Sequence, residues 1–364
     1  MSLMTDSVAE QIAALKDEDW AVREDAATIL GEARDARAVQ PLVAALRDAD
    51  KAVRDAAIRA LTAIGSASVE PLIGCLKDPN LTVQESAAAI LSVIGDGRVV
   101  DTFVGVLTSP NWIVRMHAAR GLGRLGEPRT VEPLIPLLQD KVKAVRQDTA
   151  AALAGIGEAA VPVLVTALKH SEWLVRLHAV EALGRIKSSH AVVPLLHVLF
   201  NDADTSVRED AARSLGAIGD PRAVEFLLVS MQNVGIRPRA IEALGQIGDR
   251  RAIPALIGVV TGATKPDNSR PLQGCGDRYD EEMFAMEAAV KALAQIRDAA
   301  VIPTLVEALQ NTVIRAEAAA ALAAFGQTVI PFLLDVLKKE RDANVLYHVR
   351  ETLAQVGWRP NRMG

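Results

Sequence analysis

The chain has 364 residues and a formal net charge of −5; half of its residues are apolar and only 3% are aromatic. This balance argues against broad nucleic-acid binding, which needs a clustered basic surface. Two distant cysteines, Cys75 and Cys275, are unlike the dense pairs of small secreted domains. No apolar run reaches the roughly 20 residues of a membrane span, and the N-terminus shows no secretory signal. The sequence therefore predicts a cytoplasmic protein with no membrane segment.

One short sequence motif, Ala-x-x-Leu-Gly-x-Ile-Gly-Asp, recurs with variations along the whole chain. Its leucine returns at intervals of 29 to 32 residues, with one longer interval of 49. A fixed period in this range marks an array of stacked repeats, which offers a long concave binding face. The leucines are Leu30, Leu61, Leu91, Leu122, Leu153, Leu183, Leu215, Leu244, Leu293, Leu322 and Leu353.

Each repeat reads as two helices. Residues 38–46 carry apolar side chains at helical spacing, with Pro41 in the first turn, and predict a helix A. Residues 53–64 predict a helix B that ends at Gly65, because glycine readily takes the left-handed conformation at a helix C-terminus. In several repeats an aspartate such as Asp96 follows the glycine, and we expect it to cap the next helix A.

An arginine opens most B helices, and it has two interpretations. It could form a basic stripe for phosphate, or a structural ladder of Arg–Asp pairs. Nearly every repeat carries the arginine, so the structural interpretation is favoured. The arginines are Arg23, Arg54, Arg115, Arg146, Arg176, Arg208, Arg237 and Arg315, and the expected partners are turn carboxylates such as Asp48, Asp78, Asp140 and Asp204.

The phrase Val-Arg-x-x-Ala-Ala-x-x-Leu-Gly-x-Ile-Gly-Asp-x-Arg-Ala-Val-x-Pro-Leu, matched closely in residues 207–224 and 236–254, resembles the HEAT-like repeats first described in phycobilin lyases. The resemblance covers residues 8–357. It implies an all-α, right-handed α-α superhelix of about eleven helix pairs, with B helices on the concave side. We expect one repeat domain over residues 1–364, a loop insertion at 261–280 and a possible truncated linker at 357–364.

A second HEAT-like family, the deoxyhypusine hydroxylases, binds two irons through His-Glu dyads on B helices. This chain contains no His-Glu pair. At the places of two dyads it has Met116 with His117 and Leu177 with His178. The sequence therefore predicts no metal site, and it suggests no other cofactor.

Repeats four and six depart from their own pattern at positions expected to face the groove. These positions lie two and three residues before the arginine that opens helix B, and one, two and five residues after it. Tryptophan and arginine are favoured at interfaces, and methionine suits adaptable surfaces, so the pattern predicts a partner-binding surface. The alternative is that the tryptophans only cover the turn between helices. The candidate residues are Trp112, Met116, His117, Arg120, Trp173, Leu177, His178 and Glu181.

The insertion at 261–280 falls between the two helices of one repeat. Long loops in compact arrays are usually functional or disordered. We expect loop contacts to a partner from Arg270, Cys275, Arg278 and Tyr279. Nearby arginines could activate the thiol of Cys275, but an incidental cysteine in a tolerated surface loop is the favoured interpretation of its chemistry.

Three functions are open at this point. The leading expectation is a non-catalytic scaffold that holds another protein or peptide segment in the groove around repeats four to six. The alternative is a bilin lyase or chaperone-like protein that handles a tetrapyrrole and its acceptor protein. Nucleic-acid binding comes third, because carboxylates dilute the groove arginines. No nucleophile–base pair or phosphate loop is visible, and the oligomeric state is open.

Overall fold

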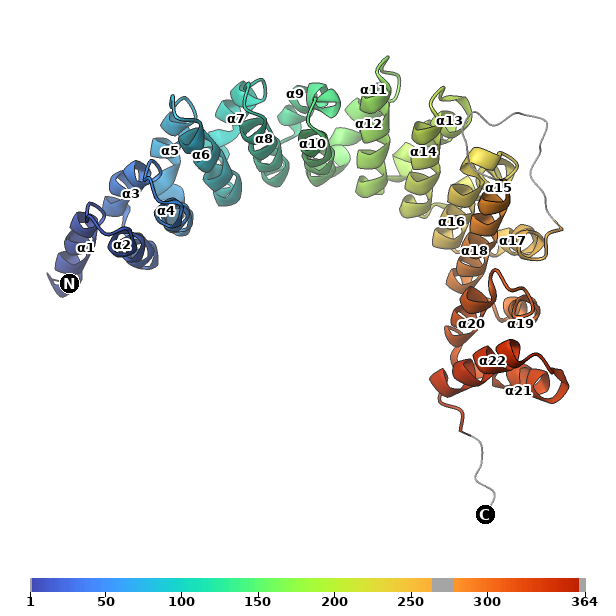
Figure 1. Cartoon of the computed structure of the whole chain (residues 1–364). Coiled ribbons are helices and arrows are strands. Elements are labelled where there is room, and N and C mark those ends of the chain that lie inside the picture. The colour runs from blue at the N-terminus through green and yellow to red at the C-terminus, as the bar shows by residue number, and fades with distance from the viewer. Residues whose placement is uncertain (1, 264–277, 360–364) are drawn as a thin grey trace. The chain divides into compact units, whose positions relative to one another are not determined.

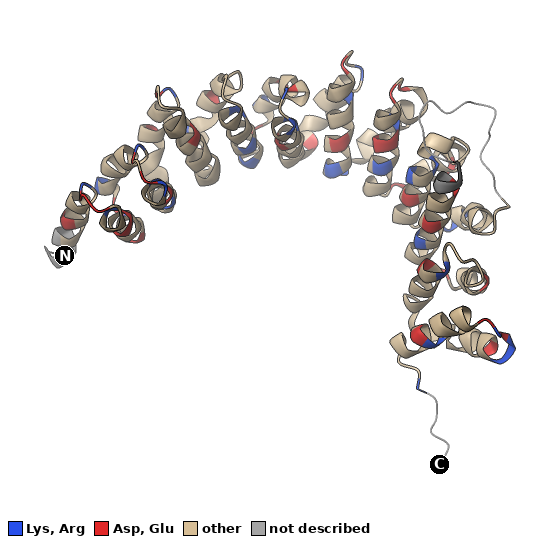
Figure 2. Cartoon of the chain, viewed as in Figure 1, with Lys and Arg blue, Asp and Glu red and all other residues tan. Residues whose placement is uncertain are grey.

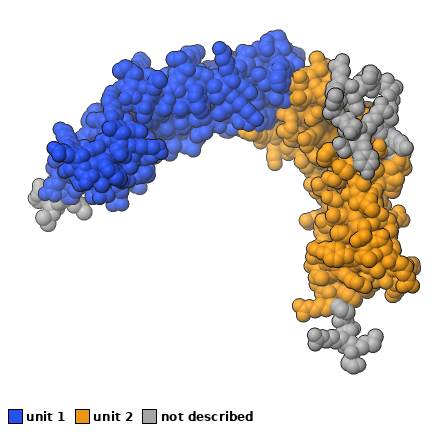
Figure 3. Space-filling view, viewed as in Figure 1, with its two compact units in different colours: residues 1–182 blue, residues 183–364 orange. Residues whose placement is uncertain are grey.

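A computed structural model describes residues 2–263 and 278–359, and throughout those ranges the regular structure is helical. The contacts divide the chain into two compact units, Met1–Ala182 and Leu183–Gly364 (Figure 3). Each unit is described by itself below. The single domain expected from the repeats therefore stays a prediction.

Unit 1 alternates short A helices with longer B helices. Its A helices are α1 (Ser2–Ala14), α3 (Val39–Ala45), α5 (Val69–Cys75), α7 (Val100–Val106), α9 (Val131–Leu134) and α11 (Val161–Ala167). Its B helices are α2 (Trp20–Ala33), α4 (Lys51–Ile64), α6 (Leu81–Ile94), α8 (Trp112–Leu125), α10 (Lys143–Ile156) and α12 (Trp173–Ile186), whose last residues belong to unit 2.

Unit 2 continues the same alternation. Its A helices are α13 (Val192–Asn201), α15 (Val224–Ser230), α17 (Ile253–Val260), α19 (Ile302–Ala308) and α21 (Ile330–Lys339). Its B helices are α14 (Thr205–Ile218), α16 (Arg237–Ile247), α18 (Arg278–Ile296), α20 (Arg315–Ala323) and α22 (Ala343–Gln355).

Within each unit the A helices form one layer and the B helices form the other (Figure 1). Successive B helices contact one another, as α2 contacts α4 and α14 contacts α16. The recurring leucine lies between the layers, since Leu61, Leu122 and Leu244 are all fully buried. Each recurring leucine has its own B helix, which confirms the all-α repeat fold. The chain is an α-solenoid.

The ends of the B helices follow the predicted pattern. Gly95 and Gly126 close α6 and α8 with φ angles of 66° and 68°, a conformation that favours glycine. The Asp96 side chain then accepts a hydrogen bond from the backbone N–H of Arg98 at 3.0 Å, which caps the segment leading into α7. The predicted capping by this aspartate is confirmed.

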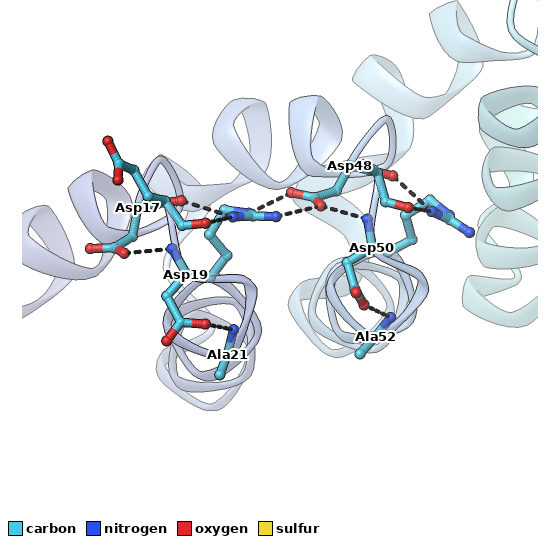
Figure 4. A network of polar contacts seen from close by, with 10 residues as sticks. Asp17, Asp19, Ala21, Asp48, Asp50 and Ala52 are labelled. Atoms are coloured by element: carbon cyan, nitrogen blue, oxygen red, sulfur yellow. Dashed lines mark hydrogen bonds and ion pairs between the residues drawn. The ribbon is translucent and has the colours of Figure 1, made fainter.

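The recurring arginines bind the backbone of the turns between helices, and some also reach an aspartate of the next turn (Figure 4). Arg23 donates to both carboxylate oxygens of Asp48 in the next turn, at 2.7 and 2.9 Å. Its third nitrogen, Nη1, donates to the backbone oxygens of Asp17 and Glu18 at 2.8 and 3.1 Å. Arg54 donates in the same way to the backbone oxygen of Asp48 at 2.8 Å. One arginine therefore ties the turn of its own repeat to the turn of the next repeat.

Two of the four expected aspartates have other partners. Asp78 forms an ion pair with Arg47, which lies in the preceding turn and not at the start of a B helix. Asp204 caps α14 by accepting hydrogen bonds from the backbone N–H groups of Ser206 and Val207. Asp204 lies two residues further along its turn than Asp48 does, whereas Asp78 occupies the same position as Asp48 and still meets a different arginine.

Two segments, Lys51–Cys75 and Lys143–Ala167, are long and apolar enough to cross a membrane by length and composition alone. Each is a B helix, a short 3-10 turn and the following A helix. The turns begin at Gly65 and Gly157, with φ angles of 74° and 78°, so neither segment is one continuous helix. Their apolar side chains are those that pair helix layers in the repeats.

Candidate functional site

The residues predicted on repeat four lie along α8. Trp112 is the first residue of the helix and its side chain is 40% exposed. Met116 and His117 are half-buried, and Arg120 is exposed. Asn111 holds the start of the helix, because its side chain accepts a hydrogen bond from the backbone N–H of Ile113 at 3.0 Å. The indole, the thioether and the guanidinium are therefore open to contact along one helix.

Polar contacts to both neighbouring B helices orient this surface. Nδ1 of His117 lies 3.5 Å from the hydroxyl of Ser92 on α6. Arg120 donates to the carboxylate of Asp148 on α10 at 2.6 Å. Burial, followed by the charge of Arg120, lowers the pKa of His117. The imidazole is therefore held neutral at neutral pH, and it suits hydrogen bonding better than ion pairing.

The residues predicted on repeat six lie along α12. Trp173 is 42% exposed and Leu177 is half-buried. His178 is only 7% exposed, and its Nδ1 lies 2.9 Å from Oε2 of Glu181 one turn later. Tryptophan and leucine are thus at the surface, whereas the histidine lies largely beneath it. The assignment of α8 and α12 to a binding surface stays a prediction.

The predicted loop contacts fall mostly outside the described residues. Arg270 and Cys275 lie in the part of the chain that is not described. Arg278 and Tyr279 begin α18, and their side chains are likewise outside the described residues. Among the side chains that the structure does describe, no group of three His, Cys, Asp or Glu residues could hold a metal ion.

The sequence did not reveal a cleft in unit 2. It has a volume of about 730 Å³ and opens between the B helices α14, α16 and α18. We call it the α16 cleft. It is lined by Glu209, Gly235, Pro238, Arg239, Glu242, Gln246, Phe284, Glu287, Ala288, Lys291, Ala292 and Gln295.

Helix length explains why a cleft forms here. The helix α16 has 11 residues, whereas α14 has 14 and α18 has 19. Pro238 occupies the second position of α16, where its missing N–H costs nothing, and the preceding turn carries Gly235 in place of a side chain. A short helix between two longer ones, with little bulk before it, leaves open space that runs along α16 from Gly235 to Gln246.

The cleft carries charges of both signs. Arg239 donates to the carboxylate of Glu242 at 2.9 Å, and this hydrogen bond raises the pKa of Arg239. Burial raises the pKa of Glu209, although the charge of Arg239 opposes the rise. Within the described part of the chain, Glu287 and Lys291 belong to no ion pair, so both stay available to a ligand.

Phe284 adds an aromatic surface to these charges, since 55% of its side chain is exposed. An aromatic wall with a few polar groups is the common composition of a small-molecule site. The cleft residues occupy the positions expected to face the groove, because Glu209 lies one residue after Arg208, and Arg239 lies two after Arg237. The sequence therefore places the side chains, but it does not show the space between them.

The comparisons with known proteins agree with this repeat architecture. The family model for HEAT repeats matches residues 8–92, 69–154, 141–199, 161–233, 192–268 and 281–354. The chain belongs to the HEAT-repeat family. This HEAT-repeat protein also superimposes on yeast importin-β (Kap95p) with a TM-score of 0.63 and 15% sequence identity, over 96% of this chain. It spans only 57% of that importin-β chain, and at this identity the likeness shows the fold alone.

One curated relative carries information about function as well as fold. The phycocyanobilin lyase subunit alpha of Nostoc sp. (strain PCC 7120) is 30% identical over 203 residues, which cover 53% of this chain and 71% of the relative. The match to a solved complex of CpcE and CpcF of phycocyanin lyase, from Nostoc sp. PCC7120, has 24% identity over 61% of this chain and 93% of that chain. Its TM-score is 0.35, too low to support an argument about the site.

The likeness to a lyase subunit corrects the leading functional expectation. A non-catalytic scaffold built around repeats four to six is wrong as the main interpretation, because the matched relative is named for its action on a bilin. The alternative, a protein that handles a tetrapyrrole, is favoured in its place. The relative is also named as a subunit, so a protein partner is consistent with the same finding.

Proposed function

We propose that this HEAT-repeat protein is a lyase- or chaperone-type protein that binds a linear tetrapyrrole and delivers it to an acceptor protein. The observation that carries the proposal is the 30% identity to a phycocyanobilin lyase subunit over 71% of that subunit. Because the relative is named as a subunit, we propose that this chain too works with a second protein.

The chemistry of the ligand agrees with the side chains on the B helices. A linear tetrapyrrole has a flat conjugated body, pyrrole N–H donors and two propionate carboxylates. Its recognition calls for aromatic surface, for acceptors and for cations. On the B helices of unit 2, the aromatic ring of Phe284 is exposed beside Glu209, Glu287 and Lys291. Figure 2 shows acidic and basic residues interleaved along the B helices, which suits an amphipathic ligand better than a polyanion.

The surface of α8 and α12 suits the acceptor protein. Trp112, Met116 and Arg120 combine an aromatic anchor, an adaptable side chain and a charge, and Trp173 with Leu177 repeats the apolar part on α12. Exposed apolar side chains with charges around them are typical of protein interaction sites. A cytoplasmic location is part of the proposal, and the free, buried thiol of Cys75 supports a reducing environment.

The test is spectroscopic. Purified protein is mixed with phycocyanobilin, and visible absorbance and fluorescence are recorded; apo-phycocyanin is then added and the mixture is separated by gel filtration. We expect a shifted absorption band on binding, followed by transfer of the bilin colour to the acceptor fraction. An unchanged spectrum across a titration with the bilin would reject the proposed function.

A further inference from the structure

We propose that the α16 cleft is the tetrapyrrole site of this protein. Phe284 would lie against the conjugated rings, Lys291 would meet a propionate, and Glu209 would accept from pyrrole N–H groups. This inference rests on the proposed function and adds the place and the chemistry of binding. No comparison assigns a ligand to these residues.

The size of the cleft fits a ligand of this kind. Its volume of about 730 Å³ lies inside the range of roughly 300–1,000 Å³ that small-molecule sites occupy. The cleft crosses three B helices, and packed helix axes are about 8–10 Å apart, so the axes of α14 and α18 lie about 16–20 Å from each other and their side chains narrow the space between them. An elongated open-chain tetrapyrrole can contact side chains of all three helices.

The apolar contact comes from the wall formed by α18. Phe284 is 55% exposed although it is a large apolar side chain, and Ala288 and Ala292 continue the same wall one and two turns later. These alanines add no bulk beside the ring, so a flat ligand can approach the helix closely. Aromatic faces pack against one another in offset or edge-on arrangements, which a conjugated bilin can adopt on this ring.

The charges are arranged for a ligand with carboxylates at its edge and N–H donors in its middle. Lys291 is exposed on α18 and belongs to no ion pair among the described residues, so it can pair with a propionate. On the opposite wall the carboxyl of Glu209 is half-buried beside Arg239. Arg239 donates to Glu242, and among the described residues no ion pair joins it to Glu209. Glu209 therefore offers acceptor oxygens to the pyrrole N–H groups.

The test measures phycocyanobilin binding to the full chain by visible absorbance. The variants are Glu209→Gln, Phe284→Ala and Lys291→Gln. Each has a matched control on an A helix of the same unit: Glu307→Gln, Phe332→Ala and Lys338→Gln. Because all six side chains are half-buried or exposed, the variants are expected to fold, and far-UV circular dichroism with a thermal melt checks this for each.

We expect each cleft variant to weaken bilin binding about tenfold or more, since each removes a charge-assisted hydrogen bond or an aromatic contact, and each control to bind as the parent does. Glu209→Gln should also move the absorption maximum of the bound bilin, because it removes a negative charge beside the conjugated nitrogens, whereas Glu307→Gln should not.

The outcomes separate this inference from the proposed function. If the parent protein binds the bilin and all three cleft variants bind equally well, the cleft is not the site and the proposed function stands. If the parent itself shows no spectral change, the proposed function fails and the inference fails with it. Loss of binding in the cleft variants with normal controls supports both.

Discussion

Arg115 of α8 holds Asp140, in the turn before α10, through two parallel hydrogen bonds. Its Nε donates to Oδ2 at 2.7 Å and its Nη2 donates to Oδ1 at 2.9 Å. Its Nη1 donates to the backbone oxygen of Ser109, in its own repeat, at 2.7 Å. The two side chains are only 14% and 9% exposed, so this contact joins neighbouring repeats away from most of the solvent.

Replacing this arginine should therefore destabilise unit 1. We expect Arg115→Ala to lower the free energy of unfolding by about 2–3 kcal/mol, because the largely buried carboxylate of Asp140 loses its cation and keeps only the backbone N–H of Val142 as a donor. Urea denaturation followed by circular dichroism measures the change. The matched control is Arg129→Ala, whose pair with Asp101 is 59% and 83% exposed and should contribute less than about 1 kcal/mol. Equal effects of the two variants would contradict a structural ladder.

The contact between Arg23 and Asp48 should also make the free energy of unfolding depend on pH. The hydrogen bond from Arg23, opposed by burial, lowers the pKa of Asp48 in the folded protein. A carboxyl with a lowered folded pKa stabilises the fold above its unfolded pKa of about 3.9, and this stabilisation disappears as the pH falls towards the folded value. We expect Asp48→Asn to be less stable than the parent at pH 7 and to approach it in stability below about pH 4. Parallel stability curves for the two proteins from pH 7 to pH 3 would contradict this assignment.

The close approach of α8 and α10 depends on a missing side chain. A Cβ added at Gly123 would lie 2.4 Å from Cα and 2.6 Å from Cβ of Ala152. Neither atom can rotate away, so we expect Gly123→Ala to cost about 1–3 kcal/mol of unfolding free energy through overpacking.

The control for this prediction is Gly105→Ala in the A helix α7, where an added Cβ meets nothing within 4 Å. Alanine is the better helix former, so this change should stabilise the protein by up to about 1 kcal/mol. Thermal melts of both variants test the pair. A stable Gly123→Ala protein would mean that the two B helices can move apart at little cost.

The tryptophans of repeats four and six have a direct test. We expect Trp112→Ala combined with Trp173→Ala to leave helical content and bilin binding unchanged, but to reduce transfer to apo-phycocyanin about thirtyfold, as the loss of a hot spot of about 2 kcal/mol would. The control is Trp20→Ala, because Trp20 also opens a B helix and is 48% exposed. If Trp20→Ala reduces transfer equally, the tryptophans only cover their turns and the acceptor binds elsewhere.

Much of this architecture follows from local sequence rules. The leucine period, the glycines that end B helices and the aspartates that follow them each act within one repeat, so the all-α repeat fold could be predicted. The arginine ladder could also be predicted in outline, since Arg23 and Arg115 do meet Asp48 and Asp140 in the next repeat. The different partners of Asp78 and Asp204 could not, because Asp204 lies two residues past the position of Asp48, and Asp78, at the same position as Asp48, is within reach of Arg47 from the preceding turn.

The candidate site, too, could be predicted only in part from the sequence. The sequence by itself determined which side chains share one side of a B helix, since a helix repeats its direction every few residues. Trp112 and Met116 share such a side on α8, and Glu209 and Arg239 occupy the corresponding positions on the B helices of unit 2. Only the tertiary structure decided that His178 lies beneath its surface and that α14, α16 and α18 enclose a space. The burial of His178 depends on the side chains packed around α12, and the cleft depends on the different lengths of three neighbouring helices. Both are set by packing between repeats and not by the residues within any one of them.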